Sequence, residues 1–237
     1  MTEKGKLYLI PVPIAEGSHD SVLPQEHKII LQNIHHFLAE DIRTARRHLS
    51  SLKIYESIDS LGFNVLNKET REAELKDFFM PVLEGKNLGV LSESGCPGVA
   101  DPGALAVQYA HQNGIRVVPL VGPSSILLAL MASGLNGQQF AFHGYLPIET
   151  REIAETIKEL EKESRKKNQT QIFIETPYRN NQITGNLLKT LHPETLLCIA
   201  IDVTGPQESI QTLTVKQWKS HPVQWPKLPA VFLFLAS

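Results

Sequence analysis

The sequence predicts an α/β protein with two α/β domains, each built on a mostly parallel sheet. Short apolar runs alternate with amphipathic stretches along the whole chain, and this alternation is typical of β-α units with helices on both faces of a sheet. Two loops that follow apolar runs, at 92–103 and 121–125, are rich in Gly, Pro and Ser. A chain of 237 residues suits two domains of about 100–120 residues. We expect an N-terminal domain over 1–119 and a C-terminal domain over 120–237.

Elements of the N-terminal half follow from apolar runs and helical periodicity. Leu75, Phe78 and Val82 recur at helical spacing, and Asp101 and Pro102 suit the N-cap and first turn of a helix that ends at Gly114. We predict strands at 6–11, 37–41, 88–91 and 116–120, and helices at 25–33, 43–52, 71–83 and 101–113.

The C-terminal half repeats this style without repeating the sequence. Ser124 or Ser125 can cap a helix that ends at Gly134. The segment 209–218 is ambiguous, and we expect it to include a strand. We predict further strands at 140–146, 171–175, 195–203 and 230–236, and helices at 126–133, 149–167 and 179–191.

Composition limits the functional classes. Apolar residues make up 42% of the chain, which is enough for a core, and the net charge is −2. Domains that bind nucleic acid are usually basic, so any RNA contact must depend on a local patch. Cys96 and Cys198 lie far apart and favour a reduced compartment. The N-terminus shows no signal peptide, and no apolar run approaches the length of a membrane span. We expect a cytoplasmic protein without a membrane partner.

Several common motifs are missing from the sequence. There is no GxGxxG after the first strand, no P-loop and no GxSxG elbow. No His/Cys spacing matches a zinc site, and the adjacent His35 and His36 would point to opposite faces of a strand. We therefore expect no metal, and dinucleotide-binding proteins, P-loop kinases and serine hydrolases are disfavoured.

The two loops rich in Gly, Pro and Ser are the main candidate binding feature. Gly has no Cβ, so such loops bring backbone N–H and C=O groups close to a ligand, and open α/β sheets bind ligands at the carboxyl ends of their strands. Each loop alone fits an ordinary β-α turn. Both are longer and richer in Gly than a connection requires, and together they favour one ligand cradle built from main chain.

A second candidate feature places acids before a basic helix. Glu40 and Asp41 lie at a predicted strand end and are candidate bases, and the spacing of Arg43, Arg46 and Arg47 puts these guanidiniums on one helix face that could hold phosphates. A solvated helix face with local ion pairs explains the same residues equally well.

Six segments, taken in order, resemble motifs of the tetrapyrrole methylase superfamily, whose members use S-adenosylmethionine (SAM). Within that superfamily the chain is most similar to the branch of small-subunit ribosomal RNA methyltransferases. The resemblance covers nearly the whole chain. The matching segments are Leu7–Ile14, Ala39–Arg43, Ser92–Gly103, Gly122–Ser125, Phe142–Pro147 and Glu175–Arg179.

The resemblance implies a tetrapyrrole methylase-like fold with a SAM-binding cleft between two α/β domains, and a homodimer. It also implies which residues contact the cofactor, largely through main chain. These cofactor-binding candidates are Ser92, Gly95, Cys96, Asp101, Ser124, Ser125, Tyr145, Leu146, Pro229 and Ala230.

The chain departs from that branch in one late segment. Where the branch has Arg-Glu-Leu-Thr-Lys, this chain has Ile201–Gly205, which keeps an acid and a Thr but lacks both cations. Glu93 and Cys96 also replace Asp and Thr.

The catalytic candidates are Glu40, Asp41 and Asp202, with Asp101 a further carboxylate, and the substrate-binding candidates are Arg43, Arg46, Arg47 and Arg179.

We therefore predict a SAM-dependent methyltransferase that methylates a ribose 2′-hydroxyl of small-subunit ribosomal RNA. A hydroxyl is a poor nucleophile until its proton is removed, so a base is expected at the site. Two alternatives remain open. One is a tetrapyrrole C-methyltransferase, although the first turn here is Pro-Val-Pro-Ile instead of Gly-rich. The other is a non-catalytic SAM-binding protein.

Overall fold

A computed structural model describes residues 3–15 and 17–237 of the chain. Its contacts divide the chain into two compact units, Met1–Ser124 and Ser125–Ser237, which we call the first and second unit and describe separately. The prediction that the N-terminus shows no signal peptide concerns a segment that starts at residues 1 and 2, and these two residues lie outside the described residues.

The first unit contains a five-stranded sheet whose neighbouring strands are all parallel. The strand order is β3-β2-β4-β1-β5. The connection from β1 to β2 runs toward one edge of the sheet, and the connection from β4 to β5 runs toward the opposite edge. The carboxyl ends of β1 and β4 therefore form a topological switch point, where open sheets bind ligands. The strands are β1 (Leu7–Ile10), β2 (Ile34–Ala39), β3 (Gly62–Val65), β4 (Asn87–Leu91) and β5 (Val117–Pro119).

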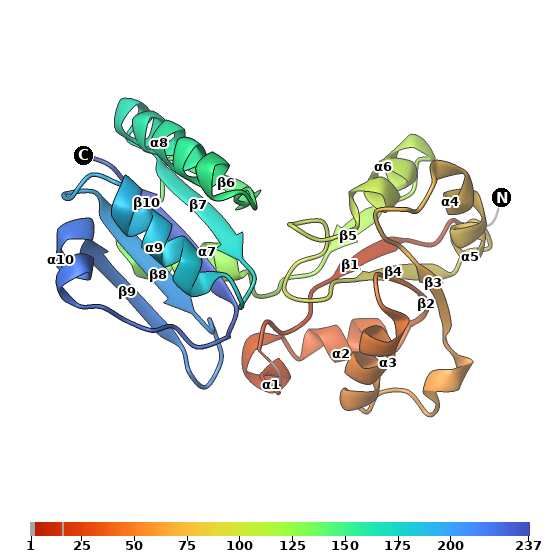
Figure 1. The fold of residues 1–237 in the computed structure, drawn as a ribbon. Coiled ribbons are helices and arrows are strands. Elements are labelled where there is room, and N and C mark those ends of the chain that lie inside the picture. Colours follow the sequence, from red (N-terminus) through yellow and green to blue (C-terminus); the bar gives the residue numbers. More distant parts are fainter. Residues whose placement is uncertain (1–2, 16) are drawn as a thin grey trace. The chain divides into compact units, whose positions relative to one another are not determined.

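Helices cover both faces of this sheet (Figure 1). Leu31 of α2 and Leu49 of α3 pack on one face with Phe37, while Leu75 of α4 and Ala106 of α6 pack on the other. The predicted parallel sheet with two helical layers is confirmed for this unit. The helices are α1 (His19–Val22), α2 (Glu26–Leu31), α3 (Ile42–Ser51), α4 (Glu72–Phe78), α5 (Met80–Leu83) and α6 (Ala104–Gln112), with a 3-10 turn η1 (Ile58–Ser60).

Two predicted helices of the first unit differ in the structure. The helix expected at 71–83 is interrupted at Phe79, because Pro81 stands in the first turn of a new helix, α5, and proline cannot continue a helix through its interior. The helix expected to begin at Asp101 begins at Ala104 instead, after Gly103. Strand β3 lies at the sheet edge and was not predicted.

The second unit contains a mixed sheet in the order β6-β7-β10-β8-β9. β6 and β7 are parallel, whereas the other three pairings are antiparallel, so the prediction of a mostly parallel sheet is wrong for this unit. The reason is a short turn at 202–208 that joins β8 directly to β9; parallel neighbours need a long crossover, but antiparallel neighbours do not. The strands are β6 (Phe140–Tyr145), β7 (Thr170–Glu175), β8 (Leu196–Ile201), β9 (Ser209–Thr214) and β10 (Ala230–Leu235).

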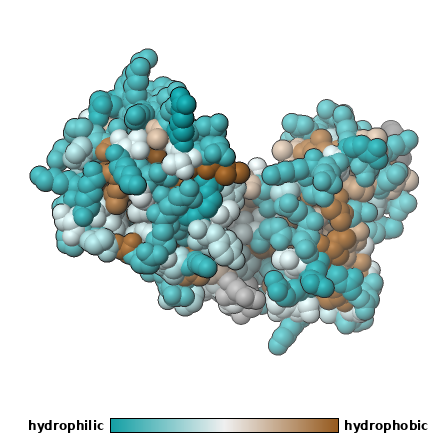
Figure 2. All heavy atoms as spheres, in the orientation of Figure 1, coloured by the Kyte–Doolittle hydropathy of each residue, from teal (hydrophilic) through white to brown (hydrophobic). Residues whose placement is uncertain are grey.

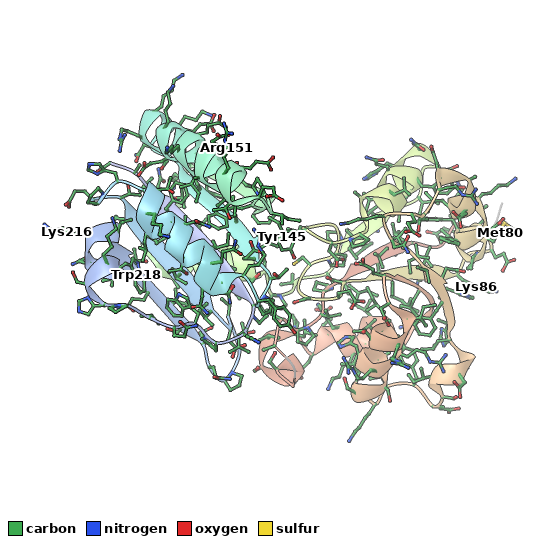
Figure 3. All side chains as sticks on the ribbon, viewed as in Figure 1. Met80, Lys86, Tyr145, Arg151, Lys216 and Trp218 are labelled. Atoms are coloured by element: carbon green, nitrogen blue, oxygen red, sulfur yellow. The ribbon has the colours of Figure 1, made fainter. Side chains whose placement is uncertain are left out.

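The helices of the second unit again lie on both sheet faces (Figure 1). α7 (Ser125–Ser133) packs on one face, and α8 (Thr150–Lys167), α9 (Asn180–Thr190) and α10 (Val215–Ser220) pack on the other. Trp218 of α10, labelled in Figure 3, donates a hydrogen bond from its indole to the Leu197 carbonyl at 2.9 Å. The face drawn in Figure 2 is mostly hydrophilic, with small separate hydrophobic patches, as expected when the large apolar residues fill the cores.

Two global features can be stated for the described residues. None of their helices combines the length and apolar character needed to cross a membrane. Cys96 and Cys198 are both free thiols.

Candidate active site

Three loops meet at the carboxyl edge of the first unit's sheet. Val12 and Gly95 exchange two backbone hydrogen bonds, at 3.0 and 3.2 Å, and so join the loop after β1 to the loop after β4. The Cys96 thiol lies 3.4 Å from the Pro123 carbonyl and so joins the loop after β4 to the loop after β5. The two loops singled out from the sequence are therefore in contact.

Glycine allows these loops to approach so closely. Gly95 has φ +73°, and a Cβ there would lie 3.2 Å from the Pro123 carbonyl oxygen. A Cβ at Gly122 would lie 2.2 Å from the Pro11 Cβ, far inside van der Waals contact. A larger residue is therefore disfavoured at Gly95 by the positive φ and at Gly122 by the contact with Pro11, and the β-α turns need both glycines independently of any ligand.

The loop after β4 has an unusual backbone. Gly95, Gly98, Gly103 and the non-glycine Ala100 all have positive φ, and a non-glycine residue in that region costs about 1–2 kcal/mol. Such residues cluster at functional sites. Val99 in this loop and Val121 in the loop after β5 are 48% and 76% exposed, so both loops present an apolar side chain that a ligand could contact.

Asp41 links the end of β2 to the loop after β4. Its carboxylate caps α3 by accepting a hydrogen bond from the Thr44 N–H at 2.9 Å, and its own N–H donates to Glu93 Oε1 at 3.2 Å. The Thr44 hydrogen bond holds the pKa of Asp41 below its ordinary value, and the nearby charges of Arg43 and Arg47 act in the same direction. Glu40 beside it is exposed.

Asp101 is bonded to the backbone of Glu93 and does not cap a helix. Asp101 Oδ1 accepts a hydrogen bond from the Glu93 N–H at 3.3 Å. Burial raises the pKa of Asp101 to about 6; hydrogen bonds from the Glu93 N–H and the Ser92 side chain oppose the rise, and the charges of Glu40 and Glu93 add to it. The predicted N-cap role of Asp101 is therefore wrong, because its carboxylate is turned back toward the strand end.

A hollow of about 390 Å³ opens at the switch point between β1 and β4. Its size lies within the usual range of about 300–1,000 Å³ for ligand pockets. Its wall is apolar along the loop after β1 and polar on the side formed by α3 and the end of β4. Among the lining residues are Val12–Ala15, Leu91–Glu93, Thr44, Arg47 and His48.

The three predicted phosphate-binding arginines point in different directions. Arg47 lines the hollow, and Arg43 is exposed. Arg46 instead forms an ion pair with Asp59 and lies over the Phe63 ring, 5.8 Å from its centroid. Arg46 therefore belongs to the packing of α3 on β3, and the three guanidiniums do not share one phosphate-binding face.

The second unit brings its own candidates to one edge of its sheet. Ala230 pairs with Glu175 on one side and Ile201 on the other, and Tyr145 pairs with Ile174; Figure 3 labels Tyr145 at the end of β6. Tyr145 and Pro229 are exposed there, whereas the side chains of Leu146 and Ala230 are buried. Ser125 begins α7, directly after Ser124, the last residue of the first unit.

The charged candidates of the second unit are engaged internally. Arg179 pairs with the buried Glu175 carboxylate at 3.2 Å and donates to the Pro147 carbonyl at 2.7 Å. Asp202 Oδ2 accepts a hydrogen bond from the Gln207 N–H at 2.9 Å. Asp202 therefore builds the turn that joins β8 to β9. Among the described residues, no group of three His, Cys, Asp or Glu side chains is placed to hold a metal ion.

Comparison with known proteins gives a consistent picture, although no family model matches the chain. The chain is 29% identical to a ribosomal RNA small subunit methyltransferase I from Vibrio cholerae, over 89% of this chain and 69% of that protein. It is 31% identical to the protein of the same name from Halalkalibacterium halodurans, over 80% of this chain and 61% of that protein.

Solved structures share the fold. The methyltransferase CobJ superposes with a TM-score of 0.61 at 15% identity, over 98% of this chain and all of CobJ. A uroporphyrin-III-C-methyltransferase from Thermus thermophilus superposes with a TM-score of 0.54 at 19% identity, over 98% and 92% of the two chains. The chain is a methyltransferase with the tetrapyrrole methylase fold. In this methyltransferase, the loops after β1, β4 and β5 and the hollow lie at the carboxyl ends of the strands of the first unit's parallel sheet.

Proposed function

We propose that the methyltransferase transfers a methyl group from SAM to a ribose 2′-hydroxyl of small-subunit ribosomal RNA. The curated relatives carry that RNA in their names. The observation that carries the proposal is the hollow at the switch point, whose polar side carries the guanidinium of Arg47 and the carboxylate of Glu93 and which lies beside the loops rich in peptide groups. A nucleotide offers a phosphate to the first group and a hydroxyl to the second.

The loops after β4 and β5 are the proposed place for SAM. SAM supplies an electrophilic methyl group with a good leaving group, so the protein must mainly align the reactants, an effect worth about 7–11 kcal/mol. We assign its aromatic ring to the apolar side of the surface near Val99 and Val121, and its polar ends to peptide groups. The N–H and the C=O of Gly95 both form hydrogen bonds with Val12, so Gly95 fixes the shape of the loop and its backbone groups are not available to SAM. Candidates from the sequence remain part of the proposal: Ser92, Cys96, Asp101, Ser124, Ser125, Tyr145, Leu146, Pro229 and Ala230.

RNA phosphates are assigned to Arg43 and Arg47. Arg46 and Arg179 already have partners within the protein, so they are better explained as structural residues. A net charge of −2 gives no general attraction to RNA, and affinity must come from this patch and from the fit of the hollow. A cytoplasmic location, a homodimer and the small ribosomal subunit as partner belong to the same proposal.

Labelled SAM and unmethylated 30S subunits test the proposal directly. We expect label in the RNA, and specifically in a dinucleotide that resists alkali, because a 2′-O-methyl group blocks cleavage of the neighbouring phosphodiester. Label that enters a porphyrinoid instead would favour a tetrapyrrole C-methyltransferase. Calorimetric binding of SAM without transfer to either acceptor would favour a non-catalytic SAM-binding protein.

A further inference from the structure

We propose that Glu93 is the base that accepts the proton from the ribose hydroxyl, a role that depends on the proposed function. Glu93 is not one of the catalytic candidates that the sequence indicates. It follows β4 by two residues, so it lies at the carboxyl edge of the sheet next to the switch point, and it lines the hollow together with Ser92 and Arg47.

The Glu93 carboxylate is held in place and still has a free oxygen. Its Oε1 accepts a hydrogen bond from the Asp41 N–H at 3.2 Å, which fixes the side chain. Across residues 3–15 and 17–237, no donor forms a hydrogen bond with Oε2. Glu93 is partly exposed, so Oε2 can accept a proton from a substrate and pass it on to water.

The other carboxylates are less suited to this task. Asp41 is committed to the cap of α3, and Asp101 to the Glu93 N–H; neither is among the residues that line the hollow. Glu40 is exposed and lies outside that lining. Asp202 belongs to the second unit and holds the Gln207 N–H.

The charges around Glu93 support its use as a base. Burial raises the pKa of Glu93, and the carboxylates of Asp41 and Glu40 raise it further, while the Asp41 N–H and the charge of Arg47 oppose the rise. Asp101, which accepts a hydrogen bond from the Glu93 N–H, and His48, which also lines the hollow, are further titratable groups near it. A base with a pKa moved toward neutrality accepts a proton more readily at neutral pH.

The proton transfer balances as follows. The hydroxyl oxygen forms its bond to the methyl carbon as the carbon–sulfur bond breaks and its electron pair stays on sulfur, which becomes a neutral thioether. The hydroxyl proton passes to Glu93 Oε2. Solvent then takes it from there, and the carboxylate is restored for the next turnover.

The test compares Glu93→Gln with wild type and with Glu56→Gln, a control at an exposed carboxylate of the same unit that does not line the hollow. We expect Glu93→Gln to lower the single-turnover rate on 30S subunits by about 100-fold or more. The affinity for SAM, measured by calorimetry, and the melting temperature should stay close to wild type. Glu56→Gln should change none of the three.

The pH dependence and a conservative variant make the test stricter. The wild-type rate should rise with pH as Glu93 loses its proton, the rise should be absent in Glu93→Gln, and Glu93→Asp should keep part of the rate. An unchanged rate in Glu93→Gln, or a loss of SAM affinity that explains the lower rate, would overturn the role of Glu93 while leaving the proposed function intact. If wild type itself transfers no label to the RNA, the proposed function fails and the role of Glu93 fails with it.

Discussion

The two units place similar residues at the edges of their sheets and use them differently. In the second unit, Arg179 and Asp202 are bonded to neighbouring groups of the same edge. In the first unit, Arg47 and Glu93 face a hollow. In the first unit, the all-parallel sheet sends its loops to both sides of a switch point and leaves a crevice. In the second unit, the short turn from β8 to β9 holds Asp202, and the end of β7 holds Arg179 through Glu175.

The largest expected effect would sharpen this comparison in the second unit. Arg179→Met should leave the buried Glu175 carboxylate without its partner and lower the free energy of unfolding by about 3 kcal/mol. Urea denaturation measures this loss. A variant that unfolds like wild type but binds 30S subunits much more weakly would show that Arg179 contacts substrate.

The second effect concerns how closely the loops of the first unit pack. Gly122→Ala would place a Cβ against the Pro11 ring, so we expect a loss of about 1–3 kcal/mol in stability and weaker SAM binding by calorimetry. Gly137→Ala is the matched control, since nothing lies within 4 Å of its new Cβ, and it should stay within about 0.5 kcal/mol of wild type. Equal behaviour of the two variants would contradict the close approach.

The third effect separates two neighbouring arginines. Arg47→Ala should raise the KM for 30S subunits about tenfold and reduce its salt dependence, because one phosphate contact is lost. Arg46→Ala should leave KM unchanged and cost no more than about 1 kcal/mol, the usual limit for an exposed ion pair. Steady-state kinetics at two salt concentrations check both, and the reverse ranking would break the assignment.

The smallest effect is a pH dependence at Asp101. Its folded pKa of about 6 lies above the ordinary value of 3.8, so the folded state disfavours the charged form, and this cost appears as pH rises from about 4 to 6. Asp101→Asn removes the cost, so the variant should gain about 1 kcal/mol relative to wild type at pH 7 compared with pH 4, after allowance for solvent screening. Unfolding measured at both pH values checks the sign, and a relative loss at pH 7 would contradict it.

Periodicity and composition predicted most of the elements, but they did not predict strand direction. The alternation of apolar and amphipathic stretches holds in both units. It indicates that two strands consecutive in sequence run parallel only where a helix connects them, and β8 and β9 are joined without a helix. The segment 209–218 was ambiguous because it contains both β9 and α10. Pro81 is the local signal that could have divided the helix at 71–83.

At the candidate site, spacing could indicate which residues reach the sheet edge but not their partners. Asp101 fits an N-cap by its residue type, and the choice of the Glu93 N–H instead depends on how the loop folds back. Arg46 and Arg47 are adjacent in sequence, and their roles differ because Arg46 meets Asp59 and Phe63 whereas Arg47 lines the hollow, contacts that only the fold shows. A signal for Glu93 was available, because an acid directly beyond β4 must lie near the acids that follow β2 in a parallel sheet.

A crystal structure with bound S-adenosylhomocysteine tests the central claim most directly. The account predicts that peptide groups of residues 92–103 and 121–124 contact the ligand, with Val99 or Val121 against its aromatic ring. A ligand bound without contact to either loop would contradict it.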